Sequence, residues 1–314
     1  MEKLTVAAHP HIRARDNTQT LMFDVIIALL PPMIAGIYFF GYRVMVLLTI
    51  AILASVLSEW IWCKLQRVPN TVWDLSAVVS AIILVMNLPV TAPLWIPIVG
   101  SIFMIIIVKM CFGGLGQNFV NPAAAARIFL VVSFPAAMTK WVVPFTKLDI
   151  FASQAITSAT PLAIAKYGGG ELPSIMSMYL GFTGGCIGET SVVAILIGFI
   201  YLLWRKVIKW DTTIAYLATV AAFMLVVGNN PVFHLFAGGL MFGAVFMATD
   251  YTTSPITARG RVIFGVGLGL LTGIIRVFGG YPEGVCLSIL VMNVLTPLID
   301  KIKPRRFGTG RVSS

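Results

Sequence analysis

Long apolar runs constrain this chain more than any other feature of its sequence. Hydrophobic residues make up 58% of its 314 residues, charged residues 11%, and the mean hydropathy is +0.94. A helix needs about 20 apolar residues to cross a bilayer core of roughly 30 Å. The sequence therefore predicts an all-α polytopic membrane protein. We expect about ten transmembrane helices, at 21–40, 44–64, 75–90, 94–110, 122–138, 190–204, 212–228, 232–249, 262–278 and 284–300.

The distribution of basic residues predicts which side of the membrane each loop occupies. With the N-terminus in the cytoplasm, these spans leave sixteen of the 22 Lys and Arg residues on the inner side and five on the outer side. This bias follows the positive-inside rule. We therefore expect a cytoplasmic arm at 1–20, an extracytoplasmic loop at 139–189 and a basic cytoplasmic tail at 301–314. The arm is polar, which argues against a signal peptide.

The net charge of +10 is then a signal of topology, and we expect no nucleic-acid partner. The basic residues of the tail suit either contact with anionic membrane lipids or an ordinary cytoplasmic anchor.

An internal repeat divides the chain into two membrane units, 21–138 and 190–300. Asp74-Leu75-Ser76-Ala77 resembles His234-Leu235-Phe236-Ala237, and Phe112-Gly113-Gly114 resembles Phe278-Gly279-Gly280 in the same order. By our topology the third span runs outward and its counterpart, the eighth, runs inward. This pattern predicts a five-plus-five inverted repeat, as in many transport proteins. The alternative is chance similarity among Gly-rich apolar helices.

Interrupted helices are predicted at matching places in the two units. Asn121 and Pro122 suit an N-cap and a first helical position, and Pro282 suits the same first position in the second unit. Gly-rich turns precede both. Such breaks point to an ion or substrate site, although close helix packing by small residues explains them equally well.

Charged and polar residues near the spans are candidates for an ion path, because charge is costly in lipid. Most lie near predicted span ends, where interface placement or a helix-capping role is the structural alternative. The candidates are Asp24, Glu59, Asp74, Asn121, Arg127, Glu189, Asp250 and Glu283.

Metal and nucleotide chemistry have little support in the sequence. The four cysteines, Cys63, Cys111, Cys186 and Cys286, are widely spaced and form no Cys-x-x-Cys pair. Neither a Walker A loop nor a dinucleotide-binding glycine motif is present. We therefore expect no metal site and no catalytic residue in this chain.

The long loop contains a small hydroxyl-rich segment, Ser158-Ala159-Thr160-Pro161-Leu162. Thr160 followed by Pro161 predicts an N-cap and the first position of a short helix, which Gly168 would end. From local sequence alone, a helix cap is the simplest interpretation of Thr160.

Five segments of the chain have a distinctive sequence: Phe112 to Ala123, Ser158 to Leu162, Gly185 to Ser191, Ala248 to Pro255 and Gly279 to Val285. Together they resemble one family, that of the D subunit of the Rnf electron-transport complexes, which is related to the B subunit of the sodium-pumping NADH:quinone oxidoreductase. The resemblance covers nearly the whole chain.

The resemblance implies that FMN is joined through its phosphate to the hydroxyl of Thr160 by a flavin transferase. Ser158 and Ala159 are small enough to leave room for the phosphate, and Lys166 and Lys147 are placed to neutralise it. Gln154 stands where the family often has an acidic residue. The charged candidates above then become the flavin environment or the ion path.

The implied function is electron transfer of the ferredoxin:NAD+ type coupled to Na+ or H+ translocation. The chain would be one subunit of an ion-translocating oxidoreductase in the bacterial plasma (inner) membrane, inactive without the other subunits, and a second, noncovalent flavin is also compatible with the resemblance. The inverted repeat alone equally suits a channel or secondary transporter for a small polar solute, since fold does not determine function. A structural subunit that scaffolds redox partners is the third alternative.

Overall fold

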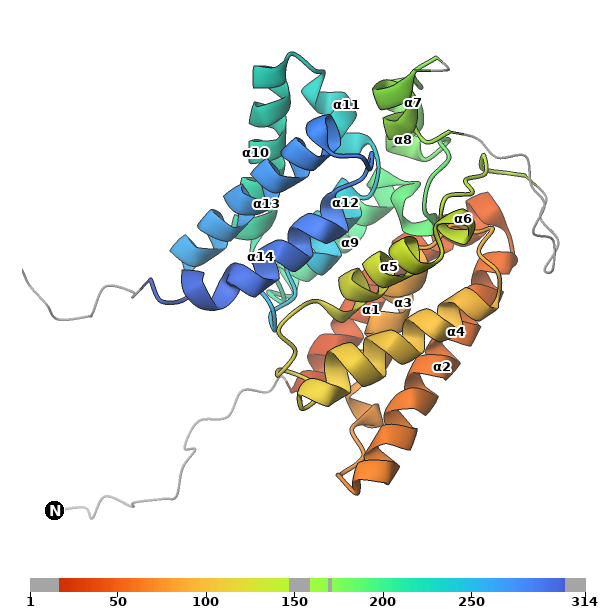
Figure 1. The fold of residues 1–314 in the computed structure, drawn as a ribbon, viewed down its shortest axis with the longest axis vertical. Coiled ribbons are helices and arrows are strands. Elements are labelled where there is room, and N and C mark those ends of the chain that lie inside the picture. Colours follow the sequence, from red (N-terminus) through yellow and green to blue (C-terminus); the bar gives the residue numbers. More distant parts are fainter. Residues whose placement is uncertain (1–16, 147–158, 169–170, 303–314) are drawn as a thin grey trace, which may run out of the picture.

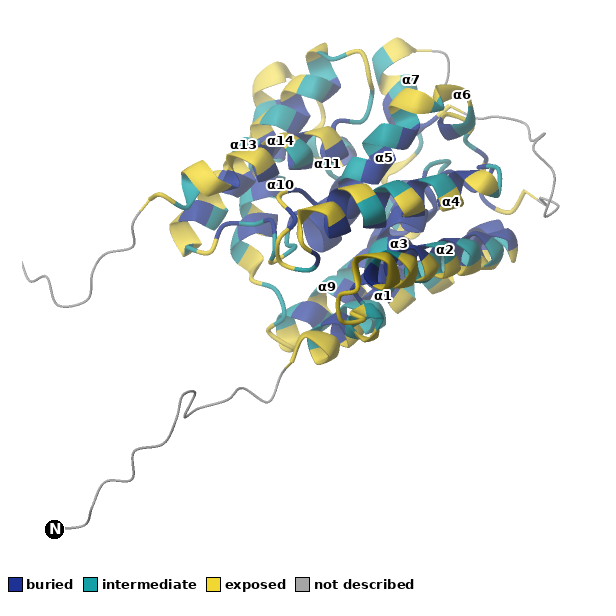
Figure 2. Cartoon of the chain, turned by 60° about the horizontal axis from the view of Figure 1, so that its bottom comes forward, coloured by how far each residue is buried: buried dark blue, intermediate teal, exposed yellow. Residues whose placement is uncertain are grey.

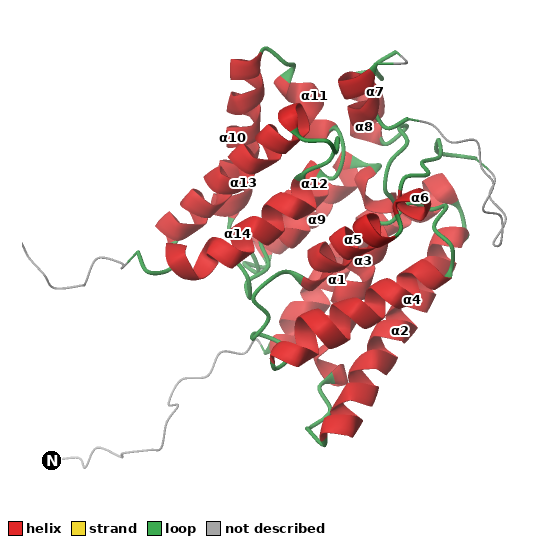
Figure 3. Ribbon diagram, viewed as in Figure 1, coloured by secondary structure: helices red, strands yellow, loops and turns green. Residues whose placement is uncertain are grey.

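The structure is a computed structural model that describes residues 17–146, 159–168 and 171–302, and all its regular elements there are helical (Figures 1 and 3). This confirms the predicted all-α polytopic membrane class. Within these described residues, five helices are long and apolar enough to cross a membrane. They are α1 (Thr18–Phe40), α2 (Arg43–Gln66), the continuous helix Trp95–Phe112, α10 (Trp210–Val227) and α13 (Ala258–Phe278). Helix Trp95–Phe112 comprises α4 (Trp95–Ile102), η2 (Phe103–Lys109) and η3 (Met110–Phe112).

The other predicted spans are shorter or divided, as interrupted helices would be. Four are apolar helices of 10–17 residues: α3 (Ser76–Met86), α5 (Pro122–Ser133), α9 (Val192–Trp204) and α14 (Val285–Ile299). The predicted span 232–249 is divided into α11 (Pro231–Phe236), α12 (Leu240–Phe242) and the π-helical η5 (Gly243–Met247). The remaining elements are η1 (Val72–Asp74), α6 (Pro135–Met138), α7 (Pro161–Tyr167), α8 (Ile175–Leu180) and η4 (Ile187–Glu189).

Two buried arginines donate hydrogen bonds to backbone carbonyls at the places where helices are interrupted. Arg43 donates from Nε to the carbonyl of Val90 at 2.7 Å and from Nη2 to that of Ala92 at 3.1 Å, beyond the end of α3. Arg276 donates to the carbonyls of His234 and Ala237, between α11 and α12. Unpaired backbone groups cost several kcal/mol in lipid. The breaks are therefore built into the fold and held by side chains.

The two halves of the chain pack their helices in the same order. In the first half, α2 packs against the helix Trp95–Phe112, and α5 packs against that same helix. In the second half, α10 packs against α13, and α14 packs against α13 as well. Across the molecule α1 contacts α9, and α5 contacts α14 (Figure 1). The division into repeats at 21–138 and 190–300, and the opposite membrane orientation of the two halves, stay predictions.

Burial follows the same division between core and outer face. Helix α3 is largely buried, whereas exposed residues run along the outer sides of α2 and α13 (Figure 2). The exposed residues of α2 include Leu53, Leu57 and Ile61. Apolar side chains on an outer face are suited to contact with lipid tails.

One predicted helix start is confirmed and one is wrong. Asn121 is the N-cap of α5, its side chain accepts from the Ala124 N–H at 3.1 Å, and Pro122 is the first helical residue. Pro282, however, precedes α14, which begins at Val285 with Gly284 as its N-cap. The reason is that the chain before α14 makes other contacts: Tyr281 accepts from Lys166, and Glu283 pairs with Arg127.

Candidate functional site

Several chain breaks meet around the guanidinium of Arg127, which lies in α5 and is 7% exposed. Its Nη1 donates to Oδ1 of Asn87 at 2.7 Å and to Oε1 of Glu189 at 3.2 Å. Its Nη2 donates to Sγ of Cys186 at 3.2 Å and to Oε2 of Glu283. We call these five residues the Arg127 cluster. They come from α5, the end of α3, the η4 segment and the loop before α14, so one side chain joins both halves.

Close backbone packing brings the η4 segment to this point. The Ile187 N–H donates to the Leu88 carbonyl at 3.1 Å, just beyond α3. A Cβ on Gly188 would lie 2.7 Å from Cβ of Met86, which is too close for any side chain. Glycine at 188 therefore permits the contact that places Cys186 and Glu189 beside Arg127.

The turn before α12, at Gly239, also contacts the cluster. A Cβ on Gly239 would lie 2.6 Å from Oε1 of Glu189. The Glu189 carboxylate is thus packed directly against the backbone. A side chain at 239 would displace it from Arg127.

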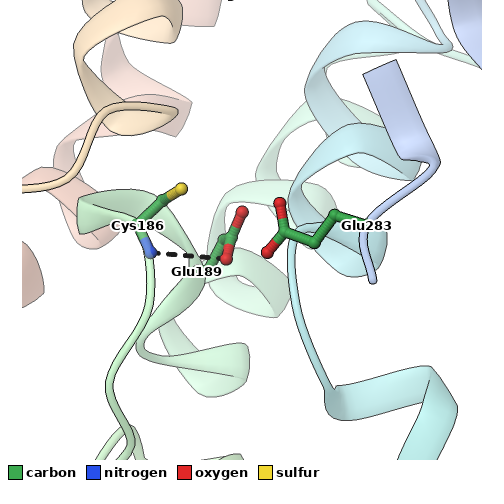
Figure 4. A group of neighbouring side chains, drawn as sticks. All are labelled: Cys186, Glu189 and Glu283. Carbon is green, nitrogen blue, oxygen red and sulfur yellow. Dashed lines mark hydrogen bonds between the residues drawn. The ribbon is translucent and has the colours of Figure 1, made fainter. Parts of the chain in front are cut away.

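Three possible metal ligands gather in the cluster. Figure 4 shows Cys186 and Glu189 on the η4 segment and Glu283 facing them from the loop before α14. One ligand atom each of Cys186, Glu189 and Glu283 lies within 4.8 Å of the others. All three, however, accept from the guanidinium of Arg127. A fixed positive charge at that position opposes the binding of a cation. The geometry is therefore that of a salt-bridge group.

Glu283 is the least enclosed acid of the cluster. It lies in the loop between α13 and α14, outside the helical spans, and its side chain is 18% exposed. Burial and the nearby Glu189 carboxylate, opposed by the positive charge of Arg127, together raise the pKa of its carboxyl to about 7. The charge of Glu283 is therefore sensitive to pH near neutrality.

A largely apolar cavity of about 210 Å³ adjoins the cluster. Arg127 and Glu283 are the charged residues of its lining. Thr160, Trp141 and Tyr281 also line it, with Ile128, Val131, Val132, Met138, Thr139, Ile275, Pro282, Val285, Cys286 and Leu287. The structure thus brings three of the predicted site residues, Thr160, Arg127 and Glu283, to one cavity, with Glu189 behind them.

Thr160 has the local structure predicted for it. It is the N-cap of α7, its Oγ1 accepts from the Ala163 N–H at 3.2 Å, and Pro161 is the first helical residue. Gly168 follows the helix with a φ of +73°. Thr160 is 5% exposed. Leu162 anchors α7 in a small apolar cluster with Met178, Phe233 and Ala237.

Lys166 contacts the end of α13 instead of the region around Thr160. Its Nζ donates to the carbonyls of Arg276 at 3.0 Å, of Gly279, and of Tyr281 at 3.4 Å. The neighbouring Tyr167 hydroxyl donates to the Gly280 carbonyl at 2.6 Å. An ammonium has three donors, and here three carbonyls face it. Lys166 therefore ties α7 to the loop after α13.

The other predicted site residues are separated from this cavity. Ala159 is exposed, and Ser158, Lys147 and Gln154 lie outside the described residues. Asn121 and Asp250 form a second group, in which Asn121 Nδ2 donates to Oδ2 of Asp250 at 3.5 Å. That group lines a smaller cavity of about 80 Å³ with Lys109 and Asn118. Asn121 precedes Arg127 by six residues, or about 9 Å along a helix.

Two members of the Arg127 cluster were missed by reasoning from sequence. Asn87 stands two residues before Pro89, and that break was the available signal. Cys186 was considered only as one of four widely spaced cysteines. It is buried, but its sulfur accepts from Arg127. A contact between residues 59 positions apart leaves no local pattern.

The fold and the cluster define an all-α membrane protein with interrupted helices and a buried charge network between its halves. Residues 5–308 match the family described as the NQR2, RnfD, RnfE family. The chain belongs to this family.

Similar proteins include members of several ion-translocating complexes, and each of the following is the D subunit of its complex. The chain is 49% identical to the D subunit of the Na(+)-translocating ferredoxin:NAD(+) oxidoreductase complex of Acetobacterium woodii, over 98% of this chain and 96% of that subunit. It is 40% identical to the D subunit of the proton-translocating ferredoxin:NAD(+) oxidoreductase complex of Clostridium ljungdahlii, over 98% of this chain and 97% of that subunit. It is 34% identical to the D subunit of the ion-translocating oxidoreductase complex of Actinobacillus succinogenes, over 99% of this chain and 99% of that subunit.

Proposed function

We propose that this chain is a membrane subunit of an oxidoreductase complex that couples ferredoxin:NAD+ electron transfer to ion translocation. The full-length similarity to proteins of such complexes supports this function. Two of those relatives are named for different ions, Na+ and the proton. The coupling ion of this chain is therefore left as Na+ or H+, and the other subunits are its expected partners.

The finer proposal is that FMN is phosphoester-linked to Thr160, with its ring in the 210 Å³ cavity. The observation that carries it is the position of the Thr160 side chain, which lines an apolar cavity that Arg127 also lines. The residues present fit such a group. An ester oxygen keeps lone pairs, so it still accepts from Ala163, and Trp141 and Tyr281 offer aromatic surface to a flat ring.

Each part of the site then has a physical task. Bound flavin supplies electron transfer. Thr160 anchors it, and Lys166 and Tyr167 hold α7 in place. The apolar wall excludes water, and the ion pair of Arg127 with Glu283 lines one end. Maturation would require a flavin transferase, which under the predicted topology acts outside the bacterial plasma membrane.

The test is flavin fluorescence of the chain on a denaturing gel, using complex purified from native membranes that contain the transferase. Fluorescence should comigrate with this chain and disappear in Thr160→Ala. Thr139→Ala is the matched control, because Thr139 lines the same cavity and its hydroxyl donates to Pro135. Its band should stay fluorescent.

A dark wild-type band, or a fluorescent Thr160→Ala band, contradicts the covalent link. A dark wild-type band would also favour the channel or scaffold alternatives.

A further inference from the structure

The two carboxylate oxygens of Glu283 have different surroundings. Oε2 accepts from Arg127. Oε1 is buried and has no hydrogen-bond partner among the described residues. A buried acceptor without a partner is costly, so a structure that keeps one invites a functional explanation.

The charges around Glu283 sum to zero. Arg127 of α5 contacts both Glu189 and Glu283. Arg276 of α13 also lies close to Glu283, since a Cβ on Gly238 would lie 3.4 Å from Glu283 Oε1 and 3.5 Å from Arg276 Nη2. Two guanidinium groups thus balance two carboxylates. The other titratable groups near them are the thiols of Cys186 and Cys286, together with Tyr216, His234 and Lys166 beside Arg276.

The two carboxylates balance the two arginines, so neither arginine has spare positive charge for an anion in the adjoining cavity. An electron added there creates one uncompensated negative charge in an apolar site, which is unfavourable. Arg276 is held by the carbonyls of His234 and Ala237, and Arg127 is shared by two acids. Of the two carboxylates, Glu189 has both oxygens paired, whereas Oε1 of Glu283 has no partner among the described residues and can take a proton without losing a bond.

We propose that Glu283 takes up one proton when the cavity gains an electron, and releases it when the electron leaves. The electron comes from reduced ferredoxin through the complex, and the proton comes from the aqueous phase and binds Oε1. The Arg127–Glu283 ion pair becomes a hydrogen bond to a neutral acid, so the charge of Arg127 then faces the cavity. Total charge is unchanged, because one electron and one proton enter together. This inference rests on the proposed flavin at Thr160.

Infrared difference spectra of the oxidised and reduced holocomplex test the step. Reduction should produce a carbonyl band of a protonated carboxylic acid in the wild type, and Glu283→Gln should remove it. The control is Glu59→Gln, which alters another buried carboxylate, paired with Lys109 in the first half, and should leave the band unchanged. A second readout is the midpoint potential of the flavin, whose dependence on pH between about 6 and 8 should flatten in Glu283→Gln.

Glu283→Asp separates protonation from folding, because it keeps the acid and shortens the side chain. It should retain a carboxylic acid band, shifted in frequency. A wild type without the band, or an unchanged band in Glu283→Gln, overturns the inference. Gel fluorescence read on the same samples distinguishes the two failures: a covalently flavinylated chain without the Glu283 band contradicts this step alone, whereas a dark chain contradicts the proposed function.

Discussion

Two buried ion-pair groups in this protein differ in how completely they are satisfied. In the first half, Lys109 Nζ lies 3.0 Å from both oxygens of Glu59 and 2.5 Å from the Ser76 hydroxyl, and Thr71 donates to Glu59 at 2.5 Å. Its acid is fully buried. The Arg127 cluster instead leaves one oxygen of Glu283 unpaired among the described residues, beside a larger cavity.

The comparison separates a structural role from a chemical one. A network in which every donor and acceptor is paired holds helices together and resists a change of charge. A network with an unpaired, partly exposed acid can change its protonation at lower cost. Both groups are buried ion pairs, so burial of charge alone does not identify the functional site.

The largest expected effect distinguishes the two groups by stability. Lys109→Ala leaves Glu59 buried without a counter-ion, and we expect a loss of about 3–5 kcal/mol in the free energy of unfolding. Arg127→Ala should cost less, because Glu283 can take up a proton. Thermal unfolding of the purified complex measures both. The double variant Lys109→Met with Glu59→Leu removes the whole pair and should recover most of the loss.

A larger loss in Arg127→Ala than in Lys109→Ala would break the comparison, since it would show that the Arg127 cluster is the more rigid of the two.

A medium effect is expected where the Glu189 carboxylate touches the backbone. In Gly239→Ala the new Cβ would be 2.6 Å from Glu189 Oε1, so the carboxylate must move away from Arg127. We expect a cost of about 1–3 kcal/mol from overpacking. Gly280→Ala is the control, because a Cβ there has nothing within 4 Å. Equal unfolding temperatures for the two variants would contradict the packing described here.

The smallest effect concerns the attachment of α7. Lys166→Met removes the donor to three carbonyls at the end of α13, and we expect a local loss of about 1 kcal/mol. Faster hydrogen exchange of the α7 amides, with little change elsewhere, is the expected result. Tyr167→Phe removes a single bond and should give a weaker effect. If exchange in α7 does not change in Lys166→Met, the contact with the Gly279 region does not hold the helix.

Much of the fold was predictable because it depends on local pattern. Apolar runs predicted the helices, and Asn121 with Pro122, and Thr160 with Pro161, predicted two helix starts that the structure confirms. Pro282 misled because the loop before α14 is shaped by distant partners, Lys166 and Arg127.

The site was less predictable than the fold. Arg127, Glu189 and Glu283 were each candidates as charged residues near spans. Their meeting depends on backbone breaks and on glycines at 188 and 239, whose effect appears in three dimensions. The interpretation of Lys166 as a phosphate neighbour failed to anticipate the carbonyls at the end of α13, which lie more than a hundred positions away in the sequence.

The distance in sequence between Arg127 and its two acidic partners also determines the order in which these ion pairs can form during synthesis. On the ribosome Arg127 is synthesised 62 residues before Glu189 and 156 residues before Glu283. An unpaired arginine at the centre of a membrane helix costs roughly 2.5–3.5 kcal/mol on insertion scales. The growing chain therefore carries this charge with neither acid until η4 emerges, and with only one of them while α9 to α13 follow. The first half reaches its final electrostatic state when the loop before the last helix is in place.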